Sequence, residues 1–218
     1  MKRRKFIKWG GQLAAGAAFV PAACKLMPKE EKKMVTEVAK DPGLFGLQLY
    51  TLRDDMPKDP KGVLQQVALF GYRQIESYEG PQGMFWGMGH TGFKQYMDEL
   101  GMTIVSSHCD MNKDFEKKAA EAAAIGMKYL VCPWIGPQES IDDFKRYAAQ
   151  FNEKGEICRK NGIRFAYHNH DYSFKELEGQ IPQELMMNET DPALVDFEMD
   201  IYWVVTGGHD PETWLKKY

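Results

Sequence analysis

Short apolar segments alternate with longer amphipathic segments from residue 44 to the last residue. The apolar runs, rich in β-branched and aromatic residues, begin near positions 44, 72, 102, 127, 163 and 195. These runs predict strands, and the stretches between them predict helices with one apolar face. Each strand–helix unit takes roughly thirty residues, which is the length of a βαβ-type unit. The pattern therefore predicts an α/β protein with a parallel sheet and helical crossovers.

The same pattern gives bounds for the predicted elements. Strands are expected at 44–51, 72–77, 102–107, 127–133, 163–170 and 193–199. Helices are expected after Asp59, at 93–100, 113–125, 140–160 and 181–187, and after Asp210. Ser140, with acids two and three residues later, is a typical helix start. Residues 80–92 are expected to form a long loop.

Polar or aromatic side chains stand where the predicted strands end. They are Gln48, Glu76, His108, Trp134, the pair His168 and His170, and Asp200. No strand is followed by a GxGxxG or Walker loop, which argues against an open nucleotide-binding sheet. The polar strand ends instead favour a (β/α)8 TIM barrel, whose active sites lie on the face formed by the carboxyl ends of its strands. Eight units need ~250 residues, so the six units of 42–218 are expected to be an incomplete TIM-barrel catalytic domain whose last two units are missing.

The segment IRFAYHNHDYSF at 163–174 is the most informative stretch of the chain. It reads as a buried parallel strand with a polar carboxyl end. Because side chains alternate along a strand, His168 and His170 are expected to point the same way. Two imidazoles on one side of a strand end form half a metal site or an acid/base pair. The alternative is a pair of loop histidines that merely cap the strand.

The first 24 residues differ from the rest. Five positive charges without an acid precede an apolar, small-residue stretch that ends at Cys24, which predicts an export signal peptide. The run Arg3-Arg4-Lys5-Phe6-Ile7-Lys8 resembles a twin-arginine signal, and 20–24 resembles a lipoprotein box, with ordinary signal-peptidase cleavage as the alternative. We expect an exported protein, periplasmic or lipid-anchored in the bacterial envelope, with residues 25–41 as a tether. Membrane contact is expected only through the signal or a lipid anchor.

The net charge bears on the class of binding partner, and the cysteine spacing bears on disulfide bonds. The formal net charge of the chain is −3, and it becomes more negative without the basic leader, so a nucleic-acid partner is not expected. Beyond Cys24 the three cysteines are Cys109, Cys132 and Cys158, widely spaced and without a CxxC pair. They are expected to be free, mostly buried thiols. The sequence leaves the oligomeric state open.

Four motifs occur in the order found in one known family. They are GLQLYTLRD at 46–54, GYRQIE at 71–76, YHNHDYSF at 167–174 and MDIYW at 199–203. Together they resemble the sugar phosphate isomerase/epimerase family with the xylose isomerase-like TIM barrel, in its exported subgroup with a twin-arginine leader. The resemblance covers the leader and all of 42–218.

The resemblance implies a divalent metal ion, Mn, Mg, Co or Zn, on the carboxyl face of the barrel. By position, His168 stands where the family has its strand-five acid, and Asp200 is the strand-six ligand. The other two ligands would lie beyond Tyr218, with His170 a candidate third donor here. The resemblance implies a metal-dependent isomerase or epimerase that removes a proton next to the carbonyl of a sugar or polyol through an enediolate. Expulsion of a β-hydroxyl instead gives a dehydratase or lyase acting on a keto-sugar or inosose.

The remaining candidate residues are assigned by their position at strand ends. Glu76, His108 and His170 are expected to be catalytic, since acids and histidines at barrel strand ends usually serve the site. The expected substrate-binding residues are Gln48, Trp134, Asn169 and Trp203. For the two tryptophans, core or rim packing is the alternative to a floor for a sugar ring.

Two rival functions come from other classes. One is a non-catalytic sugar-binding lipoprotein that kept the fold. The other is a nuclease of the same superfamily, which should show more zinc-binding residues and a basic face. The expected partner is therefore an unphosphorylated small-molecule sugar, since an exported enzyme rarely meets sugar phosphates.

Overall fold

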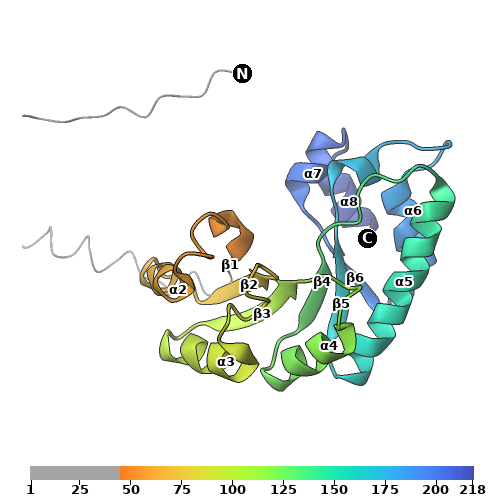
Figure 1. Cartoon of the computed structure of the whole chain (residues 1–218). Helices are drawn as coiled ribbons and strands as arrows, with labels where there is room; N and C mark the ends of the chain where they lie inside the picture. Colours follow the sequence, from red (N-terminus) through yellow and green to blue (C-terminus); the bar gives the residue numbers. More distant parts are fainter. Residues whose placement is uncertain (1–44) are drawn as a thin grey trace, which may run out of the picture. The chain divides into compact units, whose positions relative to one another are not determined.

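The computed structural model describes residues 45–218, which contain one six-stranded parallel sheet (Figure 1). The strands are β1 (Gly46–Gln48), β2 (Gln74–Tyr78), β3 (Thr103–His108), β4 (Tyr129–Cys132), β5 (Arg164–His168) and β6 (Val195–Glu198). The predicted signal peptide at 1–24 and tether at 25–41 lie outside the described residues.

The order of the strands identifies the way in which the sheet is wound. Neighbours in the sheet are also neighbours in sequence, from β1 through β6, and every pairing is parallel. A doubly wound sheet instead reverses its strand order at a switch point. Continuous order is the winding of a (β/α)8 barrel. The predicted TIM-barrel class is confirmed, with six βα units in the described residues.

Helices connect the strands and follow one side of the sheet, where Figure 1 shows α3, α4 and α5. The helices are α2 (Pro60–Leu69), α3 (Gly89–Glu99), α4 (Phe115–Ala124), α5 (Ile141–Lys160), α6 (Pro182–Glu189), α7 (Ile201–Thr206) and α8 (Pro211–Lys217). Ser140 and Asp143 form the predicted start of α5, since each side chain accepts a hydrogen bond from the other residue's backbone N–H. After α5, Gly162 has a φ of 77°, a conformation that favours glycine.

Several element bounds differ from the sequence prediction. The first strand ends at Gln48, because its side chain accepts a hydrogen bond from the Tyr50 backbone and starts a 3-10 helix, η1 (Leu49–Leu52). The strand predicted at 163–170 ends at His168, and a second 3-10 helix, η2 (Asp171–Phe174), follows. The helix predicted at 93–100 begins earlier, at Gly89. Helix α7, which the prediction missed, begins directly after Asp200.

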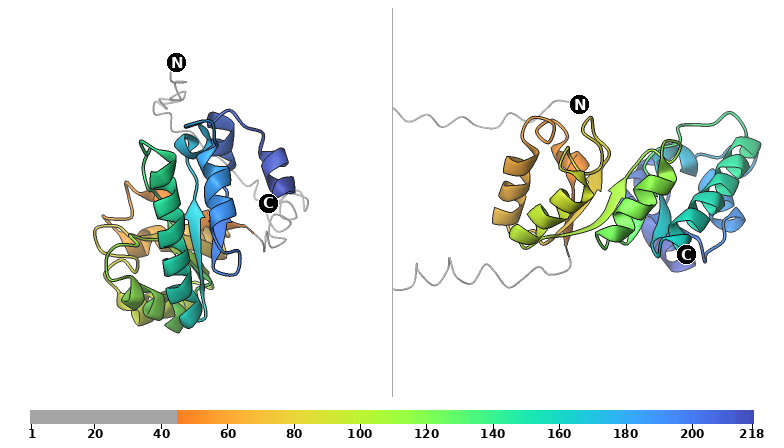
Figure 2. Two further views of the ribbon diagram at one scale, coloured as in Figure 1. Left: turned by 90° about the vertical axis from the view of Figure 1, so that its right-hand side faces the viewer. Right: turned by 60° about the horizontal axis from the view of Figure 1, so that its bottom comes forward.

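The two faces of the sheet have different surroundings. Leu130, Phe165 and Tyr167 are almost fully buried and belong to the main hydrophobic core. The alternate residues Val131 and Ala166 line a cavity on the opposite face, as the period-two geometry of strands requires. Figure 2 (left) shows α5 running alongside the strands. The hydrophobic core therefore packs against the helical side of the sheet, and the opposite face borders a cavity.

The packing of α5 predicts a large effect for one small substitution. A Cβ atom at Gly155 would lie 2.7 Å from Leu194 Cβ and 2.8 Å from its carbonyl oxygen. We expect Gly155→Ala to lower the free energy of unfolding by about 1–3 kcal/mol, because backbone must move to relieve the overlap. Chemical denaturation measures this loss. Gly92→Ala in α3 is the matched control: its Cβ would meet only Met88 Cβ at 3.7 Å, so stability should rise by up to ~1 kcal/mol. Equal effects of the two substitutions would contradict this packing.

The three cysteines of the described residues are free and buried, as predicted. Burial raises the pKa of Cys132 and of Cys158 to about 12, and it also raises the pKa of Cys109. Because the thiolate is the reactive form, we expect these thiols to react with Ellman's reagent at least about 100-fold more slowly than free cysteine at pH 8. The Cys24→Ser variant is used so that only these three cysteines can react. In guanidinium, where the protein unfolds, all three thiols should react fast. Fast reaction of the native variant would contradict the packing.

Candidate metal centre and cleft

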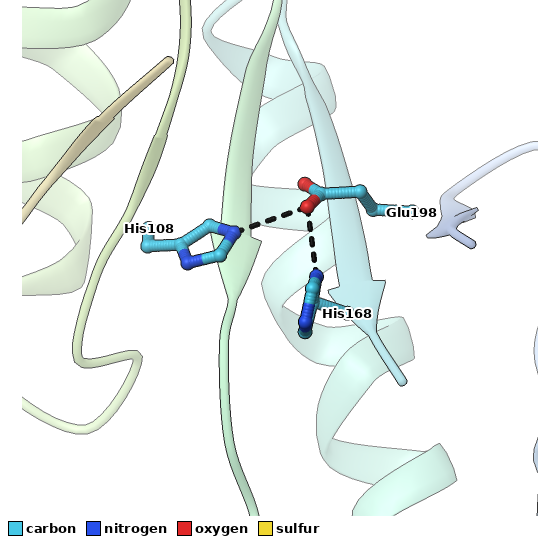
Figure 3. Close-up of side chains that lie close together, drawn as sticks. All are labelled: His108, His168 and Glu198. Carbon is cyan, nitrogen blue, oxygen red and sulfur yellow. Dashed lines mark hydrogen bonds and ion pairs between the residues drawn. The ribbon is translucent and has the colours of Figure 1, made fainter. Parts of the chain in front are cut away.

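Three side chains from three strand ends converge at the carboxyl edge of the sheet (Figure 3). His108 ends β3, His168 ends β5 and Glu198 ends β6. Glu198 Oε1 lies 2.8 Å from His168 Nδ1 and 3.2 Å from His108 Nε2. The donor atoms of the three residues all lie within 4.8 Å of one another. We call this group the His-His-Glu cluster.

Strand register explains why these residues meet. In the β5–β6 pairing, His168 stands directly opposite Glu198. Because all six strands are parallel, β3 ends at the same edge. A hydrogen bond of 2.9 Å from the Glu79 backbone N–H to the His108 carbonyl holds the end of β3 beside the end of β2. The carboxyl ends of neighbouring parallel strands therefore place their last side chains in one place.

The donor set fits a divalent metal ion. Imidazole nitrogen and carboxylate oxygen bind zinc at about 2.0–2.2 Å, so two donors of one tetrahedral ion lie roughly 3.3 Å apart. The separations of 2.8 and 3.2 Å are close to this spacing. The side chains of His108 and His168 are only 10% and 12% exposed, which keeps them in fixed positions. The cluster can hold an ion with small adjustments of the side chains.

Glu76 approaches the cluster from β2. Its Oε1 lies 3.2 Å from His108 Nε2, and its Oε2 accepts a hydrogen bond of 2.6 Å from the Ser106 hydroxyl. On the far side of the ring, His108 Nδ1 lies 3.1 Å from the Gln48 amide nitrogen. The His108 ring is therefore held between side chains of β1, β2 and β6.

The pKa values of the two carboxyls around His108 move in opposite directions. Burial alone lowers the pKa of His108, but the hydrogen bonds and charges of Glu198 and Glu76 outweigh it and raise the pKa to about 9. Burial opposes ionisation of Glu198, yet hydrogen bonds from His108 and His168 bring the pKa of this carboxyl well below its usual range. Burial raises the pKa of Glu76. Glu198 is thus suited to remain an anion, and Glu76 is suited to take up and release a proton.

Asp200 lies behind His168 rather than inside the cluster. Its Oδ2 is 3.6 Å from His168 Nε2, and its Oδ1 accepts a hydrogen bond from the Tyr202 backbone at the start of α7. The Asn169 side chain bonds both backbone groups of Asp200, at 2.9 and 3.1 Å. A carboxylate beside the second nitrogen of a ligating histidine commonly fixes its orientation.

An aromatic wall lies next to the cluster. The Trp134 ring meets the rings of His170 and Tyr172 edge-on, at centroid distances of 4.5 and 4.8 Å, and the Trp203 ring lies 5.0 Å from His170. Trp134 is 54% exposed, so a face of the indole is open to a ligand. Burial and the charge of His168 lower the pKa of His170 to about 4, so this ring is neutral near pH 7.

Most of the predicted site residues line one cleft of about 760 Å³. They are Gln48, His108, Trp134, His168, His170, Asp200 and Trp203. Glu76 and Glu198 line a neighbouring cavity on the open face of the sheet, and Gln48 borders both spaces. Asn169 is 2% exposed and lines neither of these two spaces. Its side chain bonds the Asp200 backbone and does not face the cleft.

Glu198 is the cluster member that the sequence prediction missed. The strand was predicted to run to Met199, which made Asp200 its terminal acid, whereas β6 ends at Glu198. The missed signal is the alternation of Asp196 and Glu198 with Val195 and Phe197. Such alternation places both acids on one face of a strand.

Comparisons with known proteins identify the family. No protein-family model and no curated protein sequence matches the chain. The crystal structure of a sugar phosphate isomerase/epimerase from Parabacteroides distasonis is 30% identical, with a TM-score of 0.69, and the match covers 80% of this chain and 71% of that one. A second sugar phosphate isomerase/epimerase from this organism is 29% identical, with a TM-score of 0.71, covering 79% and 74%.

A more distant structure shares only the fold. The IolI protein with a bound zinc atom is 11% identical, with a TM-score of 0.61, over 77% of this chain and 66% of that one. The fold and the 30% identity agree with each other, and they confirm the prediction of an enzyme. The chain belongs to the sugar phosphate isomerase/epimerase family.

Proposed function

We propose that this protein is a metal-dependent isomerase or epimerase that acts on a sugar or related polyol by removing a proton next to a carbonyl, through an enediolate. The His-His-Glu cluster is the observation that carries the proposal, because it offers three fixed donors beside an open cleft. The zinc atom of the IolI structure, on the same fold, supports the choice of a divalent ion. Two imidazoles and one carboxylate suit zinc, cobalt or manganese better than magnesium.

The residues of the cluster and the cleft divide metal binding, proton transfer and sugar binding among them. His108, His168 and Glu198 would hold the divalent ion, and a bound ion would supply Lewis-acid polarisation of a substrate carbonyl. Asp200 orients His168 through the second ring nitrogen. Glu76 carries the proton, because its carboxyl is buried with a raised pKa and contacts the His108 ring. The three rings of the aromatic wall that line the cleft, Trp134, His170 and Trp203, receive the apolar face of the sugar ring.

The charges of the cleft support an unphosphorylated substrate. Arg53 is the one Lys or Arg among the described residues that line the cleft, and Glu79, Asp110 and Asp200 line it too. The Arg53 side chain already bonds the Tyr50 carbonyl at 3.2 Å and lies over the Tyr50 ring at 5.0 Å. A phosphate group normally requires several donors or a cationic cluster. A neutral sugar fits these surroundings better.

Hydrogen exchange tests the proposed function directly. Protein loaded with zinc, cobalt or manganese is incubated in deuterated water with D-fructose, D-tagatose or D-psicose, and deuterium at the carbon next to the carbonyl is measured by NMR. We expect incorporation that stops on chelation by EDTA and returns with the metal. Product without one water molecule would identify the dehydratase alternative. Tight binding without any exchange would favour the non-catalytic sugar-binding alternative.

We propose that the protein is exported through the twin-arginine route. The support is the run of 3–8 followed by an apolar stretch and Cys24. Replacing both Arg3 and Arg4 with Lys should retain the protein in the cytoplasm of a bacterial host, as measured by fractionation. Unchanged export of this variant would contradict the assignment.

A further inference from the structure

An ion pair between a buried lysine and a partly exposed glutamate borders the cleft. Lys118 of α4 is 8% exposed, and its ammonium lies 2.7 Å from Oε2 of Glu79, which follows β2 directly. The ammonium also donates to the Asp110 carbonyl at 2.8 Å. A lysine this deeply buried is rare unless it is paired. The ion pair ties the loop after β2 to the loop after β3.

All described protein bonds to the Glu79 carboxylate fall on one oxygen. Oε2 accepts from Lys118 and also from the backbone N–H of Asp110, at 2.8 Å. Within residues 45–218, Oε1 accepts no hydrogen bond from the protein. The Glu79 side chain is 25% exposed and lines the cleft. A carboxylate has about four acceptor sites, so Oε1 is available to a ligand.

Glu79 lies next to His108 of the His-His-Glu cluster, backbone to backbone. Its backbone N–H donates to the carbonyl of His108 at 2.9 Å, so Glu79 and His108 stand side by side at neighbouring strand ends. Both line the same cleft. A sugar bound in this cleft therefore occupies a space that the side chains of both residues line.

We propose that Glu79 is a specificity-determining residue that accepts a hydrogen bond from one hydroxyl group of the sugar through Oε1, and that Lys118 is its positioning residue. This inference rests on the proposed function and names a further contact of the same cleft. The fixed carboxylate selects polyols that carry a hydroxyl at the matching carbon. A bound sugar that lacks this hydroxyl would exclude water from Oε1 without giving it a hydrogen-bond donor, which is costly.

The test separates this role from a purely structural tie between two loops. The double variant Glu79→Gln with Lys118→Met removes both charges, so neither is left buried and unpaired, and such neutral replacements are commonly tolerated. The amide oxygen that the first substitution introduces can still accept from the Asp110 backbone. Lys117→Met with Glu121→Gln is the matched control, because it removes a pair at 3.9 Å from the same helix.

The measurements are the KM and kcat for metal-loaded protein acting on D-fructose, D-tagatose and D-psicose, and the affinities for the monodeoxy analogues of the best of them. We expect the double variant to raise KM about 10-fold to 100-fold, with kcat within about threefold and unchanged zinc affinity. Wild type should bind one monodeoxy analogue at least about tenfold more weakly than the parent sugar, and the double variant should not distinguish the two.

Three results would overturn the inference. An unchanged KM, or equal discrimination against every analogue by wild type and double variant, would leave Glu79 a structural residue while the proposed function stands. A misfolded double variant is replaced by Glu79→Asp, for which the same discrimination should weaken. If wild type neither exchanges hydrogen with nor binds any of the three sugars, the proposed function itself fails, and this inference fails with it.

Discussion

Replacing Glu198 with Gln is expected to weaken zinc binding at least about 100-fold and to abolish hydrogen exchange into the sugar. Glu198 is the one carboxylate of the His-His-Glu cluster and contacts both imidazoles, at 2.8 and 3.2 Å. The amide keeps the size of the side chain but removes the negative charge that faces the cation. Isothermal titration with zinc measures the affinity, and deuterium incorporation measures the activity.

Asp196→Asn is the position-matched control for this variant. Asp196 stands two residues before Glu198 on β6, but its carboxylate pairs with Arg164 at 2.9 Å. Zinc affinity should change by less than about threefold in this control. The cluster would lose its assigned role if Glu198→Gln bound zinc as tightly as wild type, or if both variants lost affinity equally.

Replacing Glu76 with Gln should lower the rate of hydrogen exchange by about 10²–10⁴-fold, the usual contribution of a positioned general acid or base. The amide cannot carry the proton, although it keeps the length of the side chain. Because Glu76 is not placed in the His-His-Glu cluster, zinc affinity should fall by no more than about tenfold. Single-turnover exchange with saturating zinc separates the two effects.

Ser106→Ala provides the comparison for the Glu76 variant. It removes the 2.6 Å hydrogen bond to Glu76 Oε2 but keeps the carboxyl. A loss of about tenfold or less is expected, since one hydrogen bond to a charged group contributes roughly 1.5–3 kcal/mol and water can replace part of it. Full activity of Glu76→Gln would show that another group carries the proton.

The fold was predictable because its signals are local. The Asp59 and Ser140 helix starts hold as predicted, since their side chains accept hydrogen bonds from the backbone within the next three residues. The regular spacing of apolar runs predicts the six parallel strands. The short 3-10 helix after Gln48 was missed because it depends on one side-chain bond to Tyr50, which competes with an apolar sequence typical of a strand.

The site was predictable only in part, because it depends on register between strands. The sequence places His108, His168 and an acid near strand ends, and the structure brings these strand ends together. The sequence alone does not show which acid of 196–200 stands opposite His168. The β5–β6 pairing shows that it is Glu198. The contact between Glu76 and His108 depends on a register shift after Ile75 in the β2–β3 pairing. The alternation within β6 indicates which acids share a face, but the pairing partner of each residue depends on register with a distant strand.

We expect one divalent cation to bind among His108, His168 and Glu198. Anomalous diffraction at the zinc edge from crystals of the zinc-loaded protein measures this directly. We expect one strong peak about 2.0–2.2 Å from a ring nitrogen of each histidine and from a Glu198 carboxylate oxygen. A peak at another place, or none at saturating zinc, would contradict it.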